Sequence, residues 1–223
     1  MRRVFEKGAK YFAAGFCLAL VLATRSLGAG GPLKVEGVVK HDTAWSGSVL
    51  VERDVLVPQG VTLTVSPGTT VIFMPSDSTK IEPMFLSMQT ELLVRGVLKA
   101  EGSKEDPIRM SPAPEALSGK KPERGDWGGV IFDGPASSAS VLSHVEISKA
   151  DTAVAMYGSS PSVTDCLMED CRYGVVCIGG GRPRLAGSTI AGCDFALVGA
   201  DGGKPSADGV ALRKNGRDFL LRD

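Results

Sequence analysis

Short apolar segments that alternate with polar or small residues dominate residues 41–73, and turn residues at 58–60 and 67–68 interrupt them. The alternating apolar positions are Val49, Val51, Val55, Val57, Val61, Leu63, Val65, Val71 and Phe73. Because successive side chains of a β-strand point to opposite faces, this pattern predicts short strands that each bury one face.

The second half of the chain repeats with a period of 22 residues. Three prolines are separated by this step: Pro161, Pro183 and Pro205. The same step aligns Met168 with Ile190, and residues 175–178 with the apolar segment around Leu197. A fixed period in this range is typical of stacked supersecondary units, each of which contacts only its neighbours.

The repeat units are strands rather than helices, because Gly, Asp, Ser and Pro interrupt every apolar segment before a helix could complete three turns. We therefore predict an all-β fold, a right-handed parallel β-helix (β-solenoid) with about 22 residues per coil, from about Trp45 to Leu212. Right-handedness is expected because crossovers between parallel strands of one sheet are almost always right-handed.

The first 29 residues have the pattern of a secretory signal peptide. Four basic residues precede an apolar run at 12–23, and small residues follow at 26–29. A permanent membrane span needs about 20 apolar residues, so an uncleaved anchor is the less favoured alternative. We predict a signal peptide at 1–29 and a single β-helix domain at 30–223, exported to the periplasm, the cell surface or the cell exterior, with no membrane span in the mature chain.

The balance of basic and acidic residues argues against nucleic acids and anionic membranes as partners. The whole chain has 25 basic and 25 acidic residues, and its first 29 residues hold five of the basic and one of the acidic ones, which leaves 20 and 24. Nucleic acids and anionic membrane surfaces bind proteins through a concentrated basic surface. The mature chain is mildly acidic, so neither is expected as a partner.

A cap and two loops complete the predicted domain. Trp45 precedes the first alternating strands, where the open end of a stack needs cover, so we assign it to an N-terminal cap rather than to a ligand site. Residues 74–90 and 111–126 interrupt the coils with prolines. Long loops on a solenoid often carry function, and the alternative is that these two are tolerated surface insertions.

A succession of motifs between Trp45 and Phe132 indicates which kind of β-helix protein the chain resembles. The motifs are Trp45-Ser-Gly, Val55-Leu-Val-Pro-Gln-Gly-Val-Thr-Leu-Thr-Val65, Pro67-Gly-Thr-Thr-Val-Ile-Phe73, Leu93-Val-Arg-Gly-Val-Leu-Lys-Ala-Glu-Gly102, Pro107-Ile108 and Trp127-Gly-Gly-Val-Ile-Phe132. This succession resembles the opening of bacterial secreted right-handed parallel β-helix proteins of the pectin-lyase-like superfamily. The resemblance implies the fold and an exported location. The superfamily includes polysaccharide lyases, hydrolases, epimerases and surface proteins without known chemistry, so the fold does not choose among them.

Four cysteines lie beyond the predicted signal peptide: Cys166, Cys171, Cys177 and Cys193. None belongs to a CxxC or CxxCH motif, so the spacing does not support a zinc ribbon, a redox motif or attached haem. The 22-residue step places Cys171 and Cys193 one coil apart, at about 4.8 Å, which a disulfide accepts. An oxidising compartment permits this disulfide, and a ladder of free thiols in the interior is the alternative.

No metal site or cofactor is predicted. His144 and Glu146 are expected to share one strand face, but no third ligand can be identified, and a solvated face explains them. The carboxylates of Asp165, Glu169 and Asp170 have no counterparts in the next repeat, so they are interpreted as turn residues.

The first function hypothesis is a non-catalytic exported protein that binds a polysaccharide or a cell-envelope protein. Trp127 directly follows the loop at 111–126, so a sugar ring could stack on its indole while Lys120, Lys121 or Arg124 meets a carboxylate. The competing interpretation is that Trp127 closes the loop onto the coil beneath it.

The alternative hypothesis is a polysaccharide lyase, hydrolase or epimerase that acts on uronate-containing polymers, in which carboxylates either hold calcium or activate water. The glycosidases of the superfamily carry paired aspartates with a Gly-His-Gly motif, and this sequence has neither. The catalytic residues of such an enzyme therefore stay unknown.

Overall fold

The computed structural model describes residues 31–75, 88–206 and 208–221, so the predicted signal peptide lies outside the described residues. The described residues belong to one compact unit, Gly31–Asp223. The fold is all-β, and every strand pair in the described part is parallel. Two short helices accompany the strands, α1 (Glu115–Ser118) and the 3-10 helix η1 (Pro135–Ala139).

The strands form three rows, and the long strand β3 (Ser48–Val57) belongs to two of them. The first row runs from the first half of β3 through β5 (Thr70–Phe73), β8 (Ile108–Pro112), β11 (Val145–Ser148), β14 (Leu167–Glu169), β16 (Thr189–Ala191) and β18 (Ala211–Arg213). The second row runs from the second half of β3 through β6 (Glu91–Val94), β9 (Gly129–Asp133), β12 (Thr152–Tyr157), β15 (Tyr173–Ile178), β17 (Phe195–Ala200) and β19 (Arg217–Leu221). The third row consists of β2 (Thr43–Trp45), β4 (Thr62–Val65), β7 (Val97–Glu101), β10 (Val141–Ser143) and β13 (Ser162–Thr164).

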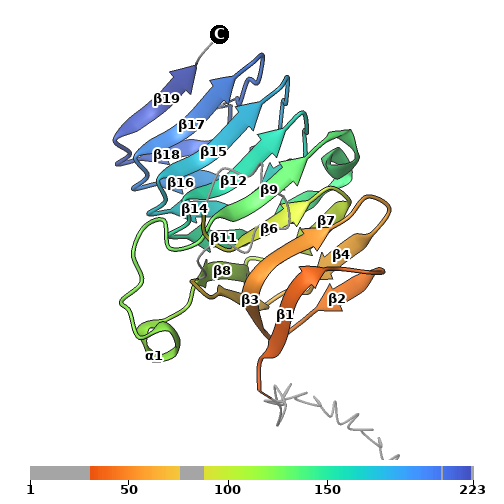
Figure 1. Ribbon diagram of the computed structural model, residues 1–223. Helices are drawn as coiled ribbons and strands as arrows, with labels where there is room; N and C mark the ends of the chain where they lie inside the picture. The colour runs from red at the N-terminus through yellow and green to blue at the C-terminus, as the bar shows by residue number, and fades with distance from the viewer. Residues whose placement is uncertain (1–30, 76–87, 207, 222–223) are drawn as a thin grey trace, which may run out of the picture. The chain divides into compact units, whose positions relative to one another are not determined.

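The chain visits the third, first and second rows in turn, so that successive circuits lie one above another (Figure 1). For example, β10, β11 and β12 pair one for one with β13, β14 and β15 of the next circuit. The predicted step of 22 residues is confirmed in the last circuits, where Met168 pairs with Ile190 and Val175 pairs with Leu197. The fold is therefore a solenoid-like stack of parallel strands.

The strands extend beyond the predicted range of Trp45 to Leu212. Strand β1 (Leu33–Val38) pairs with both halves of β3, and β19 ends at Leu221. Only two apolar residues of β1, Leu33 and Val35, alternate, and the next apolar residues, Val38 and Val39, are adjacent and break the alternation. A pattern this short does not identify a strand from sequence, and its pairing with β3 defines it instead.

One face of each row is apolar and fills the interior. In the first row Ile147, Met168 and Ile190 are fully buried, and in the second row Val154 and Val175 are fully buried. At the edge of the third row the indole of Trp45 is buried in the same core. This continuous core runs the length of the described unit.

Backbone turns at two corners repeat in register. Residues with positive φ precede the first-row strands at His144, Asp165, Gly187 and Gly209, and follow them at Lys149, Asp170, Gly192 and Lys214. A left-handed residue other than glycine costs about 1–2 kcal/mol, and short polar side chains tolerate it best. The stacked turns therefore place Asp170 directly beside Gly192, where the Asp170 N–H donates to the Ala191 carbonyl.

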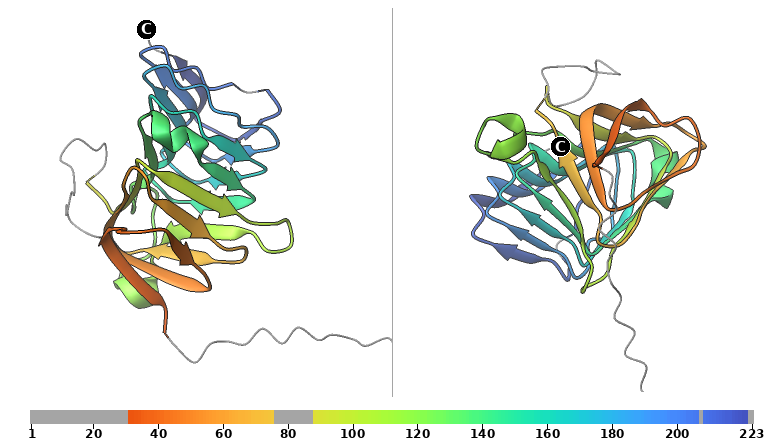
Figure 2. Two further views of the ribbon diagram at one scale, coloured as in Figure 1. Left: turned by 90° about the vertical axis from the view of Figure 1, so that its right-hand side faces the viewer. Right: turned by 90° about the horizontal axis from the view of Figure 1, so that it is seen from below.

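The loop predicted at 111–126 begins later than expected. Ser111 and Pro112 continue β8, and Pro112 pairs with Phe73. Pro112 lies beyond the residues of β8 that pair with β11, so the strand is an edge at this position, where proline is tolerated. Residues 113–126 then leave the rows of strands and carry α1 on the outside of the stack (Figure 2). Residues 76–87 of the loop predicted at 74–90 lie outside the described residues.

Candidate functional site

The loop at 113–126 is held together by its own charged residues. After α1, Gly119 adopts a left-handed conformation that ends the helix. Lys120 Nζ donates to Asp126 at 2.9 Å, and the Glu123 N–H donates to the same carboxylate at 2.7 Å. The Asp126 carboxylate raises the pKa of Lys120. Lys121 is exposed and forms no hydrogen bond or ion pair within the described part of the chain.

Arg124 fastens the loop to two later circuits. Its guanidinium donates to Asp170 at 2.7 Å, to the Gly192 carbonyl at 2.8 Å and to Asp194. Lys149 binds the other oxygen of Asp170 at 2.5 Å. The hydrogen bonds from Lys149 and Arg124 lower the pKa of Asp170, and the bond to Asp170 raises the pKa of Arg124. The predicted ligand-binding arginine is thus committed to carboxylates of its own chain.

Trp127 is fully buried. Its ring stacks on Phe73 with centroids 4.0 Å apart and an angle of 16° between the planes. Its indole N–H donates to the Ser148 carbonyl at 2.8 Å. Because Phe73 covers one ring face and the core encloses the rest, no face of Trp127 is open to a sugar ring. In this structure Trp127 joins the core where the loop returns to the stack, and its contact with a sugar stays a prediction.

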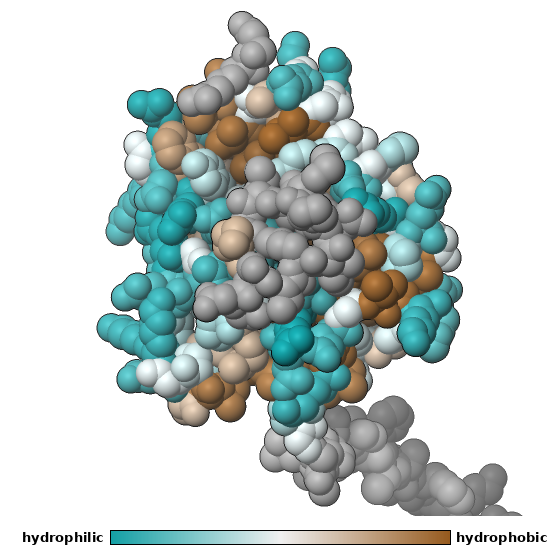
Figure 3. Space-filling model, in the orientation of Figure 1, coloured by the Kyte–Doolittle hydropathy of each residue, from teal (hydrophilic) through white to brown (hydrophobic). Residues whose placement is uncertain are grey.

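The outer face of the second row carries an apolar column that the sequence did not single out. Residues of eight successive strands pair in register along it: Val38, Leu56, Leu93, Ile131, Ala155, Val176, Val198 and Leu220. Five of them form a second cluster of buried residues, separate from the interior core. We call this set the outer apolar column. Figure 3 shows hydrophobic side chains gathered over its upper end, where β15, β17 and β19 lie.

A groove of about 700 Å³ follows the upper end of this column. Its lining includes Tyr173, Val176, Ile178, Val198, Ala200 and Leu220. At one end, Arg172 Nη1 lies 3.2 Å from Asp151 Oδ1. Burial raises the pKa of Asp151 above its ordinary value of 3.8, and Arg172 opposes this shift. The groove therefore combines aliphatic side chains with polar residues, among them this ion pair.

A ring stack borders the groove. Tyr173 and Phe195 lie in successive circuits with centroids 5.4 Å apart and an angle of 16° between their planes. The guanidinium of Arg217 covers the Phe195 ring at 5.8 Å. Each group occupies a face of its neighbour, so the stack contributes mainly to the cohesion of the circuits.

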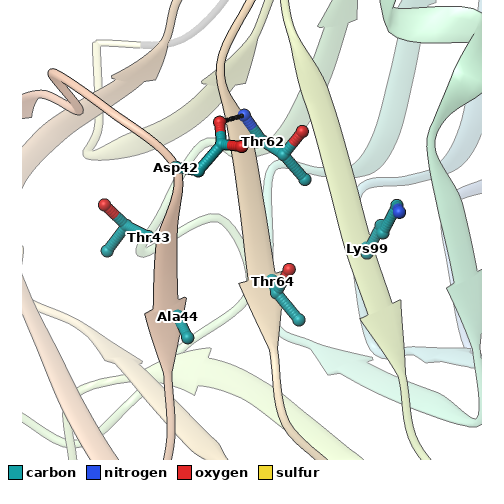
Figure 4. A pocket seen from close by; sticks show the side chains of 6 residues that line it. All are labelled: Asp42, Thr43, Ala44, Thr62, Thr64 and Lys99. Carbon is teal, nitrogen blue, oxygen red and sulfur yellow. Dashed lines mark hydrogen bonds between the residues drawn. The ribbon is translucent and has the colours of Figure 1, made fainter.

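A second, smaller hollow lies on the outer face of the third row (Figure 4). It has a volume of about 380 Å³ and is lined by Asp42, Thr43, Ala44, Thr62, Thr64 and Lys99. Asp42 accepts a hydrogen bond from the Thr62 N–H at 2.8 Å. Asp42 is the only carboxylate of this lining, so the hollow does not contain the paired carboxylates that glycoside hydrolysis requires.

Two buried carboxylates were missed by the sequence analysis. Asp54 and Glu91 are 5% and 1% exposed, and the Glu91 N–H donates to Asp54 Oδ1 at 2.9 Å. The Glu91 side chain lies against Gly128, where a Cβ atom would come within 2.1 Å of it. Both carboxylates have further interactions. The one signal in the sequence was an acidic residue at the start of the apolar strand β6.

The described cysteines are all buried free thiols. Burial raises the pKa of Cys166 and of Cys177 to about 12. Cys171 and Cys193 occupy successive circuits, as the 22-residue step predicts, and their disulfide stays a prediction. In the described ranges, no group of three or more His, Cys, Asp or Glu side chains could hold a metal ion.

The fold and this face define an all-β, parallel, solenoid-like protein with an apolar groove along one outer side. No family model, curated protein or solved structure gave a significant match to the chain. No helix among the described residues is long and apolar enough to cross a membrane.

Replacing Trp127 with alanine should destabilise the fold. Removing a buried aromatic ring typically costs about 3–5 kcal/mol, and here it also removes the stacking partner of Phe73. Urea denaturation followed by circular dichroism measures this loss. Lys121→Ala is the control, because exposed substitutions usually change stability by less than about 0.5 kcal/mol. Equal stability of both variants would show that Trp127 does not hold the loop in place.

The contacts of Asp170 predict a pH dependence. A depressed pKa in the folded state means that Asp170 stabilises the fold above its ordinary pKa of 3.8, and that this contribution disappears as the pH falls through the lowered value. Asp170→Asn should therefore lower the free energy of unfolding by about 0.5–1 kcal/mol at neutral pH, since the pair is partly exposed. Its difference from the wild type should vanish at low pH.

Asp165→Asn is the matched control, because Asp165 has the same left-handed backbone and has no ion pair within the described ranges. Asparagine tolerates this conformation as well as aspartate does, so both variants keep the turn. A pH-independent difference between Asp170→Asn and the wild type would contradict the ion-pair explanation.

Proposed function

We propose that the chain is an exported right-handed parallel β-helix protein of the pectin-lyase-like type that binds a partner protein and performs no catalysis. The parallel register and the order of the three rows support the β-helix. The apolar run at 12–23 and the small residues after it support export to the cell envelope or beyond.

The apolar groove is the observation that carries the binding proposal. Soluble proteins rarely leave a continuous apolar patch exposed unless it is used for interaction. Here the interior core is already complete on the opposite face of the same strands, so the half-buried aliphatic side chains of Val198 and Leu220, next to the buried Val176, are not needed to fill it. Their regular spacing along the stack suits an extended segment of a partner that presents aliphatic side chains.

A polysaccharide fits this surface less well. Sugar rings bind proteins through exposed aromatic faces and convergent polar groups. Trp127 is buried, the rings of Tyr173 and Phe195 stack on each other, and the charged groups at the groove, Asp151 and Arg172, are paired with each other. Of the two kinds of partner, the geometry therefore favours a protein.

Export can be checked on the chain secreted by a bacterial host. N-terminal sequencing should find that the secreted protein begins at Ala29 or Gly30, because the small residues at 26–29 follow the apolar run. Recovery of the full-length chain in the membrane fraction would identify the segment as an anchor instead.

The groove can be tested by selecting binders from a library of extended peptides. The wild type should enrich peptides with alternating aliphatic side chains, and Val198→Asp should weaken their binding about tenfold or more, because the new carboxylate would be desolvated. Val141→Asp is the matched control, since Val141 is also half-buried and lies on the outer face of the third row, paired with the exposed Lys99. Fluorescence anisotropy measures both affinities.

Three results would contradict this function. The first is that no peptide binds, and the second is that Val198→Asp and Val141→Asp behave alike. The third is binding or cleavage of pectate or alginate, with or without calcium, which would favour a glycan-binding or lyase function instead.

A further inference from the structure

Cys171 and Cys193 belong to a column of small residues at one corner of the stack. The backbone defines this column: the Arg172 N–H donates to the Ala150 carbonyl, the Asp194 N–H to the Cys171 carbonyl, and the Gly216 N–H to the Cys193 carbonyl. The two cysteines are therefore equivalent positions of successive circuits.

The two thiols also share one local conformation. Cys171 Sγ donates to the Glu169 carbonyl at 3.3 Å, and Cys193 Sγ donates to the Ala191 carbonyl at 3.6 Å, in each case two residues earlier. Both cysteines are buried in the core. Equivalent residues of neighbouring parallel strands lie about 4.8 Å apart, and a disulfide accepts Cα separations of about 4.4–6.8 Å.

Two ion pairs of Arg124 lie next to the two cysteines. Arg124 bonds to Asp170, which precedes Cys171, and to Asp194, which follows Cys193. The interaction between the two thiol side chains lowers the pKa of Cys193 and raises that of Cys171. The nearby Arg124 charge also lowers the pKa of Cys193. The two cysteines are thus positioned for unequal roles, with Cys193 the better nucleophile.

We propose that Cys171 and Cys193 form a disulfide that links two successive circuits when the chain meets a disulfide oxidant. This inference does not depend on the proposed binding function. Cys166 and Cys177 lack such a partner, because the equivalent positions one circuit later are Ser188 and Gly199.

The chemistry is thiol–disulfide exchange. The Cys193 thiolate attacks one sulfur of a small disulfide, such as oxidised glutathione, and releases one thiolate as a mixed disulfide forms. The Cys171 thiolate then attacks the Cys193 sulfur, forms the internal bond and releases the second thiolate. The protein loses two electrons and two protons, and the oxidant is reduced to two thiols. Opening of β18 and β19, which each pair on one side only among the described strands, gives the oxidant access to Cys193.

Tryptic mapping after oxidation tests the proposal. The chain is incubated with oxidised glutathione, unfolded, alkylated and digested without reductant. Cleavage after Lys149, Arg172, Arg184 and Arg213 should yield peptide 150–172 linked to peptide 185–213, with a mass about 2 Da below the sum of the two. Thermal unfolding should shift up by about 5–10 °C on oxidation and return with reductant.

Because peptide 150–172 also contains Cys166, variants decide which cysteine is linked. The link and the thermal shift should persist in Cys166→Ser and disappear in Cys171→Ala. Alanine is suitable there because Ala150 occupies the same column one circuit earlier, and circular dichroism checks that the variant folds. Four alkylated thiols after oxidation, or a link that is lost in Cys166→Ser and kept in Cys171→Ala, would overturn the proposal.

Discussion

The parallel hydrogen bonds between successive circuits are the constraint on which the rest of the structure depends. They fix each residue beside its equivalent one circuit later, as Met168 beside Ile190 and Val175 beside Leu197. A shift of one residue would turn every later side chain of a strand to the opposite face. Apolar character therefore repeats along the inward-facing columns, and extra residues are accommodated in loops such as 113–126.

The same register sets the electrostatics of the corner where this loop is attached. Asp170 and Asp194 belong to different circuits, yet both lie within reach of Arg124, because the turns that carry them are stacked. Lys149, one circuit before Asp170, binds the same carboxylate from its own turn. The loop at 113–126 is thus attached to circuits that follow it in the chain. Its Arg124 stabilises this attachment through ion pairs and is not free to bind a ligand.

Much of the fold could be predicted from the sequence because a repeat records the register directly. The step between Pro161 and Pro183 correctly aligned the strands that pair in space. The site was less accessible to this reasoning. Trp127 follows a charged loop, and nothing in the sequence shows that Phe73, from an earlier circuit, lies 4.0 Å from its ring. The ion pair of Asp194 could not be predicted, because its partner Arg124 is 70 residues away in the sequence.

The outer apolar column was missed for another reason. In residues 175–178 every side chain is apolar, and such a run does not reveal which residues face inward and which face outward. Val175 and Cys177 turned out to join the interior, whereas Val176 joins the outer cluster. A strand that is apolar on both faces is expected where a second layer covers it.

The other two rows show that the fold itself does not demand an apolar outer face. On the first row Arg109 forms an ion pair with Glu146 at 2.9 Å, and on the third row Thr64 lies beside Lys99. These rows have the same parallel pairing and the same apolar interior, so solvated outer faces are compatible with this architecture. The parallel pairing alone therefore does not require the aliphatic side chains around Val198, and this is consistent with the proposed binding of a partner protein.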